Sequence, residues 1–282
     1  MRIKIVLVGD RGVGKTSLIK RYAADKFFPK EQGTLGARMY PLDVEIPVDE
    51  TEVAKVKVAL FDFMGEHAMR ENFRDALFYG THGGIAVCDL SRKDTLYSLA
   101  EWVEALSSVT GGVPVAVLMN KADLAQSVTI GADEMRWFHE QFPQVPTHVT
   151  SARTGQGVEQ AFNQIIARTV DSLLDARRRE QANRALRLQI LSAIARRESS
   201  REASGLSKKD LLEAFKGTEP KVVLQELSNL LQLDLIEQKE SGEKAFVQFE
   251  AIPVTFRFTL TPAGRKAAAD PQAVDLIVDE MV

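Results

Sequence analysis

A glycine-rich segment, Gly9 to Thr16 (GDRGVGKT), joins an apolar run at residues 3–8 to a stretch with helical periodicity. A strand, a loop of this pattern and a helix in succession form a phosphate-binding loop. The glycines let backbone N–H groups curl around phosphate oxygens, while Lys15 supplies a point charge and the Thr16 hydroxyl is a ligand for Mg²⁺. The positive end of the helix dipole favours the same anion. The segment therefore predicts an α/β domain with a phosphate site where its first strand ends.

Apolar runs further along the chain have the spacing of a mainly parallel sheet. Residues 42–46 alternate between apolar and polar, which is typical of an edge strand, and an acidic turn at 49–52 joins them to a second run at 53–61. Later apolar runs at 84–88 and 113–119 alternate with helical patterns, as they do in βαβ units. We expect a hairpin from the first two runs and, in all, a mainly parallel six-stranded sheet.

Polar residues follow the carboxyl ends of the predicted strands, where ligands of open α/β sheets bind. Asp62 and Gly65 follow one strand, so the carboxylate can hold Mg²⁺ through water and the glycine N–H can meet a terminal phosphate. Asn120, Lys121 and Asp123 follow another strand. A carboxylate there accepts hydrogen bonds from the N1–H and N2–H₂ groups of guanine, a donor pair that adenine lacks. The pattern favours guanine over adenine nucleotides.

These motifs resemble the Ras superfamily of small GTPases, in particular its Rab-like members, over residues 2 to about 174. The resemblance implies GTP and GDP as ligands with Mg²⁺, and protein regulators or effectors at two switch loops. It implies that Thr34 senses the γ-phosphate, that Phe27 packs on the guanine and that the Ala152 N–H bonds the guanine O6. It implies Thr16, Thr34 and Asp62 as the Mg²⁺ site. The implied nucleotide contacts are Gly9, Gly12, Val13, Gly14, Lys15, Thr16, Ser17, Phe27, Thr34, Asp62, Gly65, Asn120, Lys121, Asp123, Ser151, Ala152 and Arg153.

Two residues depart from the family pattern at positions that control hydrolysis. The family usually has Gln after the switch II glycine, whereas this chain has Glu66, which cannot donate to phosphoryl oxygens when ionised and is repelled by them. Arg11 stands in the phosphate loop where the family generally has a small residue. We expect slow intrinsic hydrolysis. The alternatives are that Arg11 pairs with Glu66 or acts as an arginine finger in cis. The candidate catalytic residues are Lys15, Thr34, Gly65, Glu66 and Arg11.

The length of 282 residues favours two domains, and we predict them at residues 1–176 and 177–282. No proline or glycine lies between Gly157 and Gly205, so the last helix of the first domain is expected to continue past the boundary. Helical patterns at 186–197, 208–216 and 221–231 precede strand patterns at 235–239 and 254–260, and Pro262 begins a final helix. This order resembles a small α+β winged helix-turn-helix domain.

Charge is divided within this second domain, because residues 177–221 are basic and residues 222–282 are acidic. A basic half can bind DNA phosphates. However, the helix predicted at 221–231, which would contact the bases in a winged helix-turn-helix domain, has few side chains that recognise bases. Protein interaction or dimerisation is therefore favoured over DNA binding, and apolar residues at 274, 277, 278 and 281 give the tail an amphipathic face for a homodimer or for its own domain. The alternative function is a DNA-binding transcriptional regulator with a degenerate GTPase site.

The use of cysteine fits a reducing, intracellular compartment. The chain's one cysteine, Cys88, excludes an intrachain disulfide, and the four histidines lack the spacing of a zinc site. No apolar run is long enough to span a bilayer, and neither a signal peptide nor a lipidation motif is expected. We therefore predict a cytoplasmic protein without a direct membrane anchor.

Overall fold

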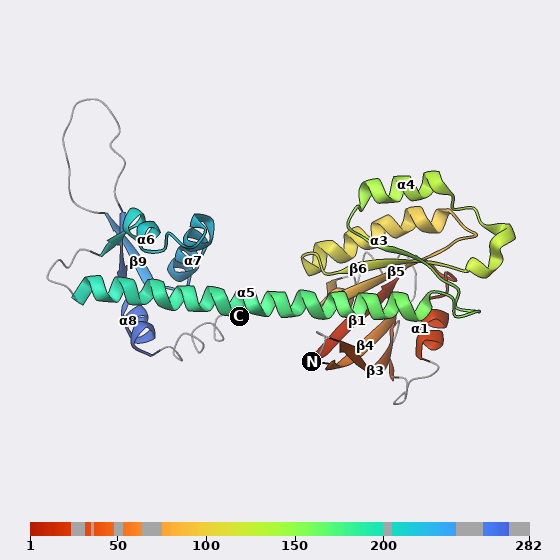
Figure 1. Cartoon of the computed structure of the whole chain (residues 1–282), viewed down its shortest axis with the longest axis horizontal. Helices are drawn as coiled ribbons and strands as arrows, with labels where there is room; N and C mark the ends of the chain where they lie inside the picture. Colours follow the sequence, from red (N-terminus) through yellow and green to blue (C-terminus); the bar gives the residue numbers. More distant parts are fainter. Residues whose placement is uncertain are drawn as a thin grey trace, which may run out of the picture. The chain divides into compact units, whose positions relative to one another are not determined.

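The computed structural model describes residues 1–23, 32–34, 37–47, 53–63, 75–199, 205–240 and 256–270. The chain divides into two compact units, Met1–Asp175 and Ala176–Val282, which are described separately (Figure 1). Two clusters of buried apolar side chains belong to the first unit and a third belongs to the second. Each unit therefore has a hydrophobic core of its own.

The first unit is built on one sheet with the strand order β2-β3-β4-β1-β5-β6-β7. Strands β4, β1, β5, β6 and β7 are parallel to one another, whereas β3 is antiparallel to both β2 and β4. The carboxyl ends of β1, β4, β5 and β6 consequently meet at one edge. The bounds are β1 Arg2–Val8, β2 Gln32–Thr34, β3 Ala37–Pro47, β4 Val53–Phe63, β5 Gly83–Asp89, β6 Val115–Asn120 and β7 Thr147–Val149.

The expected hairpin is confirmed, because β3 and β4 pair in antiparallel register from Ala37 opposite Phe63 to Pro47 opposite Val53. The predicted number of six strands is one too few for the described part of the chain, where the sheet has seven strands. The additional strand, β2, pairs with residues 37–39 of β3, so this part of β3 is not the edge of the sheet. Its three residues, Gln-Gly-Thr, carry no apolar alternation, and only the pairing defines it as a strand.

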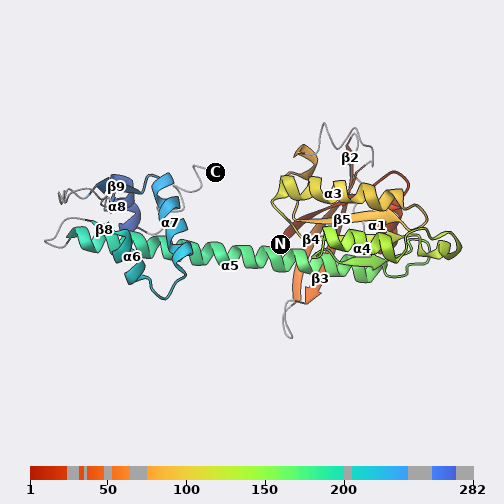
Figure 2. The same ribbon diagram turned by 90° about the horizontal axis from the view of Figure 1, so that it is seen from above.

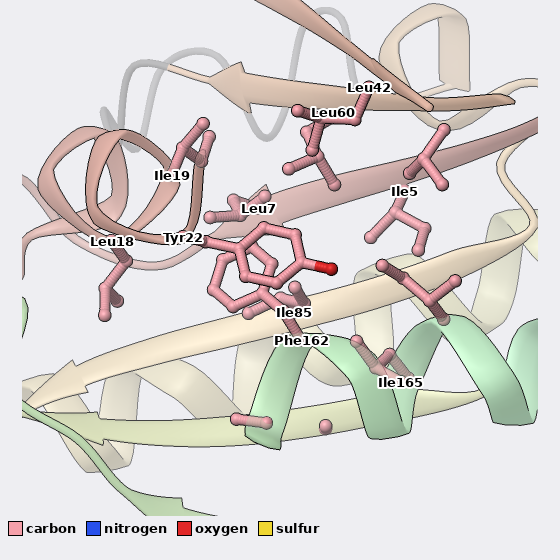
Figure 3. Packing of buried hydrophobic residues seen from close by; sticks show 14 of the residues in the cluster. Ile5, Leu7, Leu18, Ile19, Tyr22, Leu42, Leu60, Ile85, Phe162 and Ile165 are labelled. Carbon is pink, nitrogen blue, oxygen red and sulfur yellow. The ribbon is translucent and has the colours of Figure 1, made fainter. Parts of the chain in front are cut away.

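Helices pack on both faces of this sheet because side chains of β1 alternate between the faces. Ile5 and Leu7 pack with residues of α1 (Lys15–Ala23) and α5 (Val158–Ser199). Figure 3 shows this cluster, in which the Tyr22 ring lies on the Phe162 ring with centroids 4.4 Å apart. On the other face, Val6 packs with residues of α3 (Asp94–Thr110) and α4 (Ala132–Gln141). A short 3₁₀ helix, η1 (Ala122–Ser127), follows β6.

The second unit gathers its helices around the C-terminal part of α5 (Figures 1 and 2). The helix predicted separately at 186–197 is this part of α5, which confirms that the helix continues past the predicted boundary. Strands β8, β10 and β9 form an antiparallel sheet in that order. The bounds are β8 Leu206–Ser207, α6 Lys208–Ala214, α7 Pro220–Gln232, β9 Ile236–Glu240, β10 Phe256–Leu260 and α8 Pro262–Ala269.

The amphipathic tail predicted at 274–281 lies outside the described residues. Within the described ranges, no helix combines the length and the apolar character that crossing a bilayer requires.

Gly264, in the first turn of α8, packs directly on the backbone of Leu235. A Cβ atom built on Gly264 would lie 1.8 Å from the Leu235 carbonyl oxygen, which is far inside van der Waals contact. The approach is fixed by Thr261, whose hydroxyl accepts from the Gly264 N–H at 3.0 Å and donates to the Asp234 carbonyl at 2.7 Å. Glycine at this position therefore lets α8 dock on the loop before β9.

We expect Gly264→Ala to lower the free energy of unfolding of the second unit by about 1–3 kcal/mol, the usual cost of overpacking. Urea unfolding of the full chain, followed by circular dichroism, measures this change. Gly217→Ala is the matched control, because nothing lies within 4 Å of a Cβ atom at Gly217. Equal stability of the two variants would contradict the proposed role of the close contact.

Candidate functional site

The loop between β1 and α1 follows the phosphate-binding pattern, and two of its glycines are required by close contacts. Gly9 has φ +132°, and a Cβ atom there would lie 2.2 Å from the Val87 carbonyl oxygen. Gly14 has φ +104°, and a Cβ atom there would lie 2.2 Å from Nδ2 of Asn120. The loop can therefore curl tightly at the edge of the sheet only because these two side chains are absent.

Lys15 begins α1, and its side chain is buried against the loop. Its Nζ donates to the carbonyl oxygens of Gly9 at 2.8 Å and Asp10 at 2.9 Å. Burial lowers the pKa of Lys15, while the charges of Asp62 and Asp10 act in the opposite direction. A buried ammonium held by two neutral carbonyls is a strong potential partner for an anion.

Thr16 and Asp62 meet beside this ammonium. The Thr16 hydroxyl, in the first turn of α1, donates to Oδ2 of Asp62 near the end of β4. The structure thus brings together two of the three residues expected at Mg²⁺. The third, Thr34, ends β2, where its backbone pairs with Ala37. Hydroxyl and carboxylate oxygens are the ligands that Mg²⁺ prefers.

Three other expected residues, Phe27, Gly65 and Glu66, lie outside the described residues. Ser17 and Arg11 are described, and both are exposed.

Asn120 ends β6 and connects the phosphate loop to the predicted base-reading loops. Its Nδ2 donates to the Val13 carbonyl at 2.8 Å, and its Oδ1 accepts from the Ala152 N–H at 3.1 Å. The side chain is almost fully buried, so both contacts lie in a low-dielectric interior. The Ala152 N–H, expected to bond the guanine O6, is here used by Asn120. Asn120 therefore fixes the loops as well as belonging to the base-reading motif.

Asp123 lies next to the loop that follows β7. Its Oδ1 accepts from the Ser151 hydroxyl at 2.6 Å, and its Oδ2 lies 3.9 Å from the Arg153 guanidinium. Arg21 of α1 holds the same loop, donating to the carbonyl oxygens of Ala152 at 2.9 Å and Arg153 at 2.6 Å. The carboxylate is thus held on one side by a hydroxyl, as a preorganised acceptor requires.

Lys121 has a left-handed backbone, with φ +69°, and its Nζ lies 2.6 Å from Oδ2 of Asp89. Asp89 ends β5 and is only 1 % exposed. Burial alone raises the pKa of a carboxyl, but hydrogen bonds from Lys121, Ser91 and Arg92 outweigh it and hold the pKa of Asp89 below its usual value. Sequence reasoning missed Asp89, although its place after an apolar strand, as with Asp62, is a usable signal.

The Asp10 carboxylate anchors the phosphate loop to α3. Its Oδ1 accepts from the Ser98 hydroxyl at 2.7 Å and from Nε1 of Trp102 at 3.4 Å. The next residue, Arg11, accepts at its backbone carbonyl from Nη2 of Arg92 at 3.2 Å. The outer side of the phosphate loop is therefore held by side chains from residues 92–102, and no sequence motif indicated these contacts.

The donor set fits a magnesium complex of a purine nucleotide. One end supplies a buried ammonium, the amides at the start of α1 and a hydroxyl paired with a carboxylate. The other end supplies a carboxylate acceptor on Asp123 and the ordered loop of Ser151. Asn120 and its bond to Val13 connect the two ends directly.

Comparison with known proteins agrees with this geometry. The model of the Ras family matches residues 4–171. The chain is 29% identical over 177 residues to DnaJ homolog subfamily C member 27-A of Xenopus laevis, covering 61% of this chain and 62% of that protein. It is 32% identical over 164 residues to Ras-related protein RABA1e of Arabidopsis thaliana, covering 58% and 72%. It is 29% identical over 160 residues to GTP-binding protein ypt1 of Schizosaccharomyces pombe, covering 56% and 75%.

The matched region spans about three fifths of the length of the first of these relatives. The family match covers more than half of this chain and includes the phosphate loop, the Thr16–Asp62 pair and the segment from Asn120 to Arg153. The chain therefore belongs to the Ras family.

Proposed function

We propose that the first domain, residues 1–176, binds GTP and GDP with Mg²⁺ and acts as a nucleotide-dependent switch. The observation that carries this proposal is the connection of a phosphate end to a base end through the buried side chain of Asn120. Lys15 would hold the β- and γ-phosphates, and Thr16 and Asp62 would hold Mg²⁺ together with Thr34. Bound Mg²⁺ would neutralise charge on the phosphate oxygens. Loops around Thr34 and Gly65 would respond to the γ-phosphate and contact regulators or effectors.

Asp123 would select the base. An ionised carboxylate only accepts hydrogen bonds, so it matches the adjacent N1–H and N2–H₂ donors of guanine. Adenine lacks this donor pair, and Asp123 would remain unpaired beside it. The Ser151 hydroxyl, which already donates to Asp123, would keep this acceptor oriented. A site built on such hydrogen bonds rejects a ligand that lacks them by about 10⁴–10⁵.

Calorimetric titration of the nucleotide-stripped full chain with GDP, GTP and ATP in the presence of magnesium tests this proposal. We expect tight binding of both guanine nucleotides and a much weaker affinity for ATP. Equal affinities for guanosine and adenosine nucleotides, or no binding, would overturn it.

Hydrolysis of GTP is proposed to be slow because Glu66 stands where the family usually has Gln. An ionised carboxylate is repelled by the γ-phosphate and cannot donate to it. We expect Glu66→Gln to raise the single-turnover rate of GTP cleavage about 10²-fold or more, the lower end of the range of about 10²–10⁴-fold that a positioned acid or base contributes. A wild-type rate equal to or above that of the variant would refute the inhibitory role of Glu66.

Arg11 provides the competing mechanism, since an arginine finger in cis contributes about 10³–10⁵ in rate where it operates. The Arg11 side chain is exposed and its backbone carbonyl is held by Arg92. We therefore propose that Arg11 does not stabilise the transition state. The same single-turnover measurement on Arg11→Ala tests this. Loss of an arginine finger would lower the rate of GTP cleavage, whereas removal of a bulky side chain that obstructs the transition state would not.

The second domain, residues 177–282, is proposed to be a winged-helix-like module that delivers the output. The support is its element order, in which the end of α5 is followed by β8, α6, α7, β9, β10 and α8. We favour a protein partner, or a second copy of this chain, over DNA. The exposed side chains of α7, such as Lys221, Gln225 and Ser228, include one positive charge. A protein that binds the DNA backbone usually neutralises several phosphates, so this face of α7 does not favour DNA.

Electrophoretic shift assays with GTP and with GDP, over a range of salt concentrations, test this preference. We expect no salt-dependent shift of duplex DNA in either nucleotide state. Salt-dependent binding would favour DNA as the partner. Sedimentation of the full chain with GTP and with GDP tests the homodimer directly. A monomer in both nucleotide states would rule out the homodimer.

A further inference from the structure

A single buried carboxylate, Asp89, joins two cationic side chains at the edge of the sheet. Its Oδ2 lies 2.6 Å from Nζ of Lys121 and 3.1 Å from Nε of Arg92. Its Oδ1 accepts from both the N–H and the hydroxyl of Ser91, at 3.0 and 2.7 Å. The carboxylate is therefore fixed from several directions, and it is the counter-ion of both cations.

The two cations lead to opposite ends of the candidate site. Arg92 donates through Nη2 to the Arg11 carbonyl of the phosphate loop at 3.2 Å. Lys121 lies between Asn120 and Asp123 in the base-reading segment, and its left-handed backbone is a conformation that costs a non-glycine residue roughly 1–2 kcal/mol. Asp89 itself pairs with Asn120 across β5 and β6. The Asp89 carboxylate is therefore connected through Arg92 to the phosphate loop and through Lys121 to the base-reading segment.

We propose that Asp89 is a positioning residue that holds the phosphate loop and the base-reading segment in a fixed relation before a nucleotide arrives. This inference rests on the proposed nucleotide function. A ligand that bridges two loops binds more tightly when the loops need no ordering, because the entropy of ordering has already been lost. Asp89 supplies this order through Lys121 on one side and Arg92 on the other, without contacting the nucleotide.

Asp89→Asn tests the proposal because it keeps the shape of the side chain and removes the charge. We expect the affinity for GDP, measured by calorimetry on the nucleotide-stripped full chain, to fall about 10–100-fold, as loss of a charge-assisted hydrogen bond predicts. Asp94→Asn is the matched control, since Asp94 is exposed in the first turn of α3. Its GDP affinity should equal that of the wild type.

A double-mutant cycle tests whether Asp89 acts on GDP binding through Lys121. If Asp89 acts through Lys121, then adding Asp89→Asn to Lys121→Met should weaken GDP binding by no more than about threefold beyond the larger single effect. Effects of the two substitutions that multiply would mean that Asp89 acts independently of Lys121, and that result would overturn the proposal.

Arg92→Met provides a second measurement if Asp89→Asn unfolds the chain, because the Arg92 side chain is 41% exposed. We expect this variant to release GDP several-fold faster than the wild type while keeping the same unfolding midpoint without nucleotide. An unchanged rate of GDP release would contradict the proposed action of Asp89 on the phosphate loop through Arg92. Wild-type protein that fails to prefer guanine nucleotides would reject the proposed function itself, whereas normal wild-type binding with unchanged variants would reject only the role of Asp89.

Discussion

Replacing Asp123 with asparagine is expected to lower the affinity for GDP by about 10²–10³-fold, because it removes charge from two hydrogen bonds worth about 1.5–3 kcal/mol each. The amide also turns one acceptor into a donor, which then faces the N2–H₂ donor of guanine. Xanthine keeps N1–H but has a carbonyl oxygen at position 2. The variant should therefore bind xanthosine diphosphate more tightly than GDP, a reversal of the order expected for the wild type.

Titration of both proteins with GDP and xanthosine diphosphate measures this reversal. Asp133→Asn is a suitable control, because Asp133 is exposed on α4, where it pairs with the exposed Arg136 at 3.3 Å. It should leave both affinities unchanged. Retention of the wild-type order by Asp123→Asn would mean that this carboxylate does not read the base.

The second large effect is expected in the other unit, where Glu226→Ala should lower the free energy of unfolding by about 3–5 kcal/mol. Glu226 of α7 is buried and accepts from Nε of Arg187 of α5, which also pairs with Glu180 at 3.1 Å. Burial alone lowers the pKa of Arg187, but the two carboxylates outweigh it and raise the pKa. Removing Glu226 would leave a largely buried guanidinium with one exposed partner, and this uncompensated charge is the cause of the large cost.

Urea unfolding monitored by circular dichroism measures the loss. Glu213→Ala is the comparison, because Glu213 and Lys216 form an ion pair in which both side chains are more than three quarters exposed. Exposed pairs contribute about 0–1 kcal/mol, so this variant should remain close to the wild type. A similar, small change in both variants would show that the buried pair does not stabilise the packing of α7 on α5.

Local patterns in the sequence predicted much of the first unit. The phosphate loop, the hairpin of β3 and β4, and the positions of Asp62 and Asn120 at the carboxyl ends of their strands all follow from motifs or from periodicity, which are properties of neighbouring residues. The short strand β2 was missed because pairing alone defines it. The helical pattern at 186–197 is the end of α5, and the absence of proline and glycine between Gly157 and Gly205 had indicated that the helix continues.

By itself, the sequence determined which chemical groups are present and at which strand ends they lie, because both depend on short-range order along the chain. Only the tertiary structure decided how these groups are held. Asn120 bonds Val13 across 107 residues, Lys121 reaches Asp89 across 32, and Arg187 pairs with Glu226 across 39. Contacts of this kind arise when parallel strands and packed helices bring distant segments together, so their partners cannot be read from spacing. The ligand class is thus encoded locally, and the geometry that would make it bind is a product of the fold.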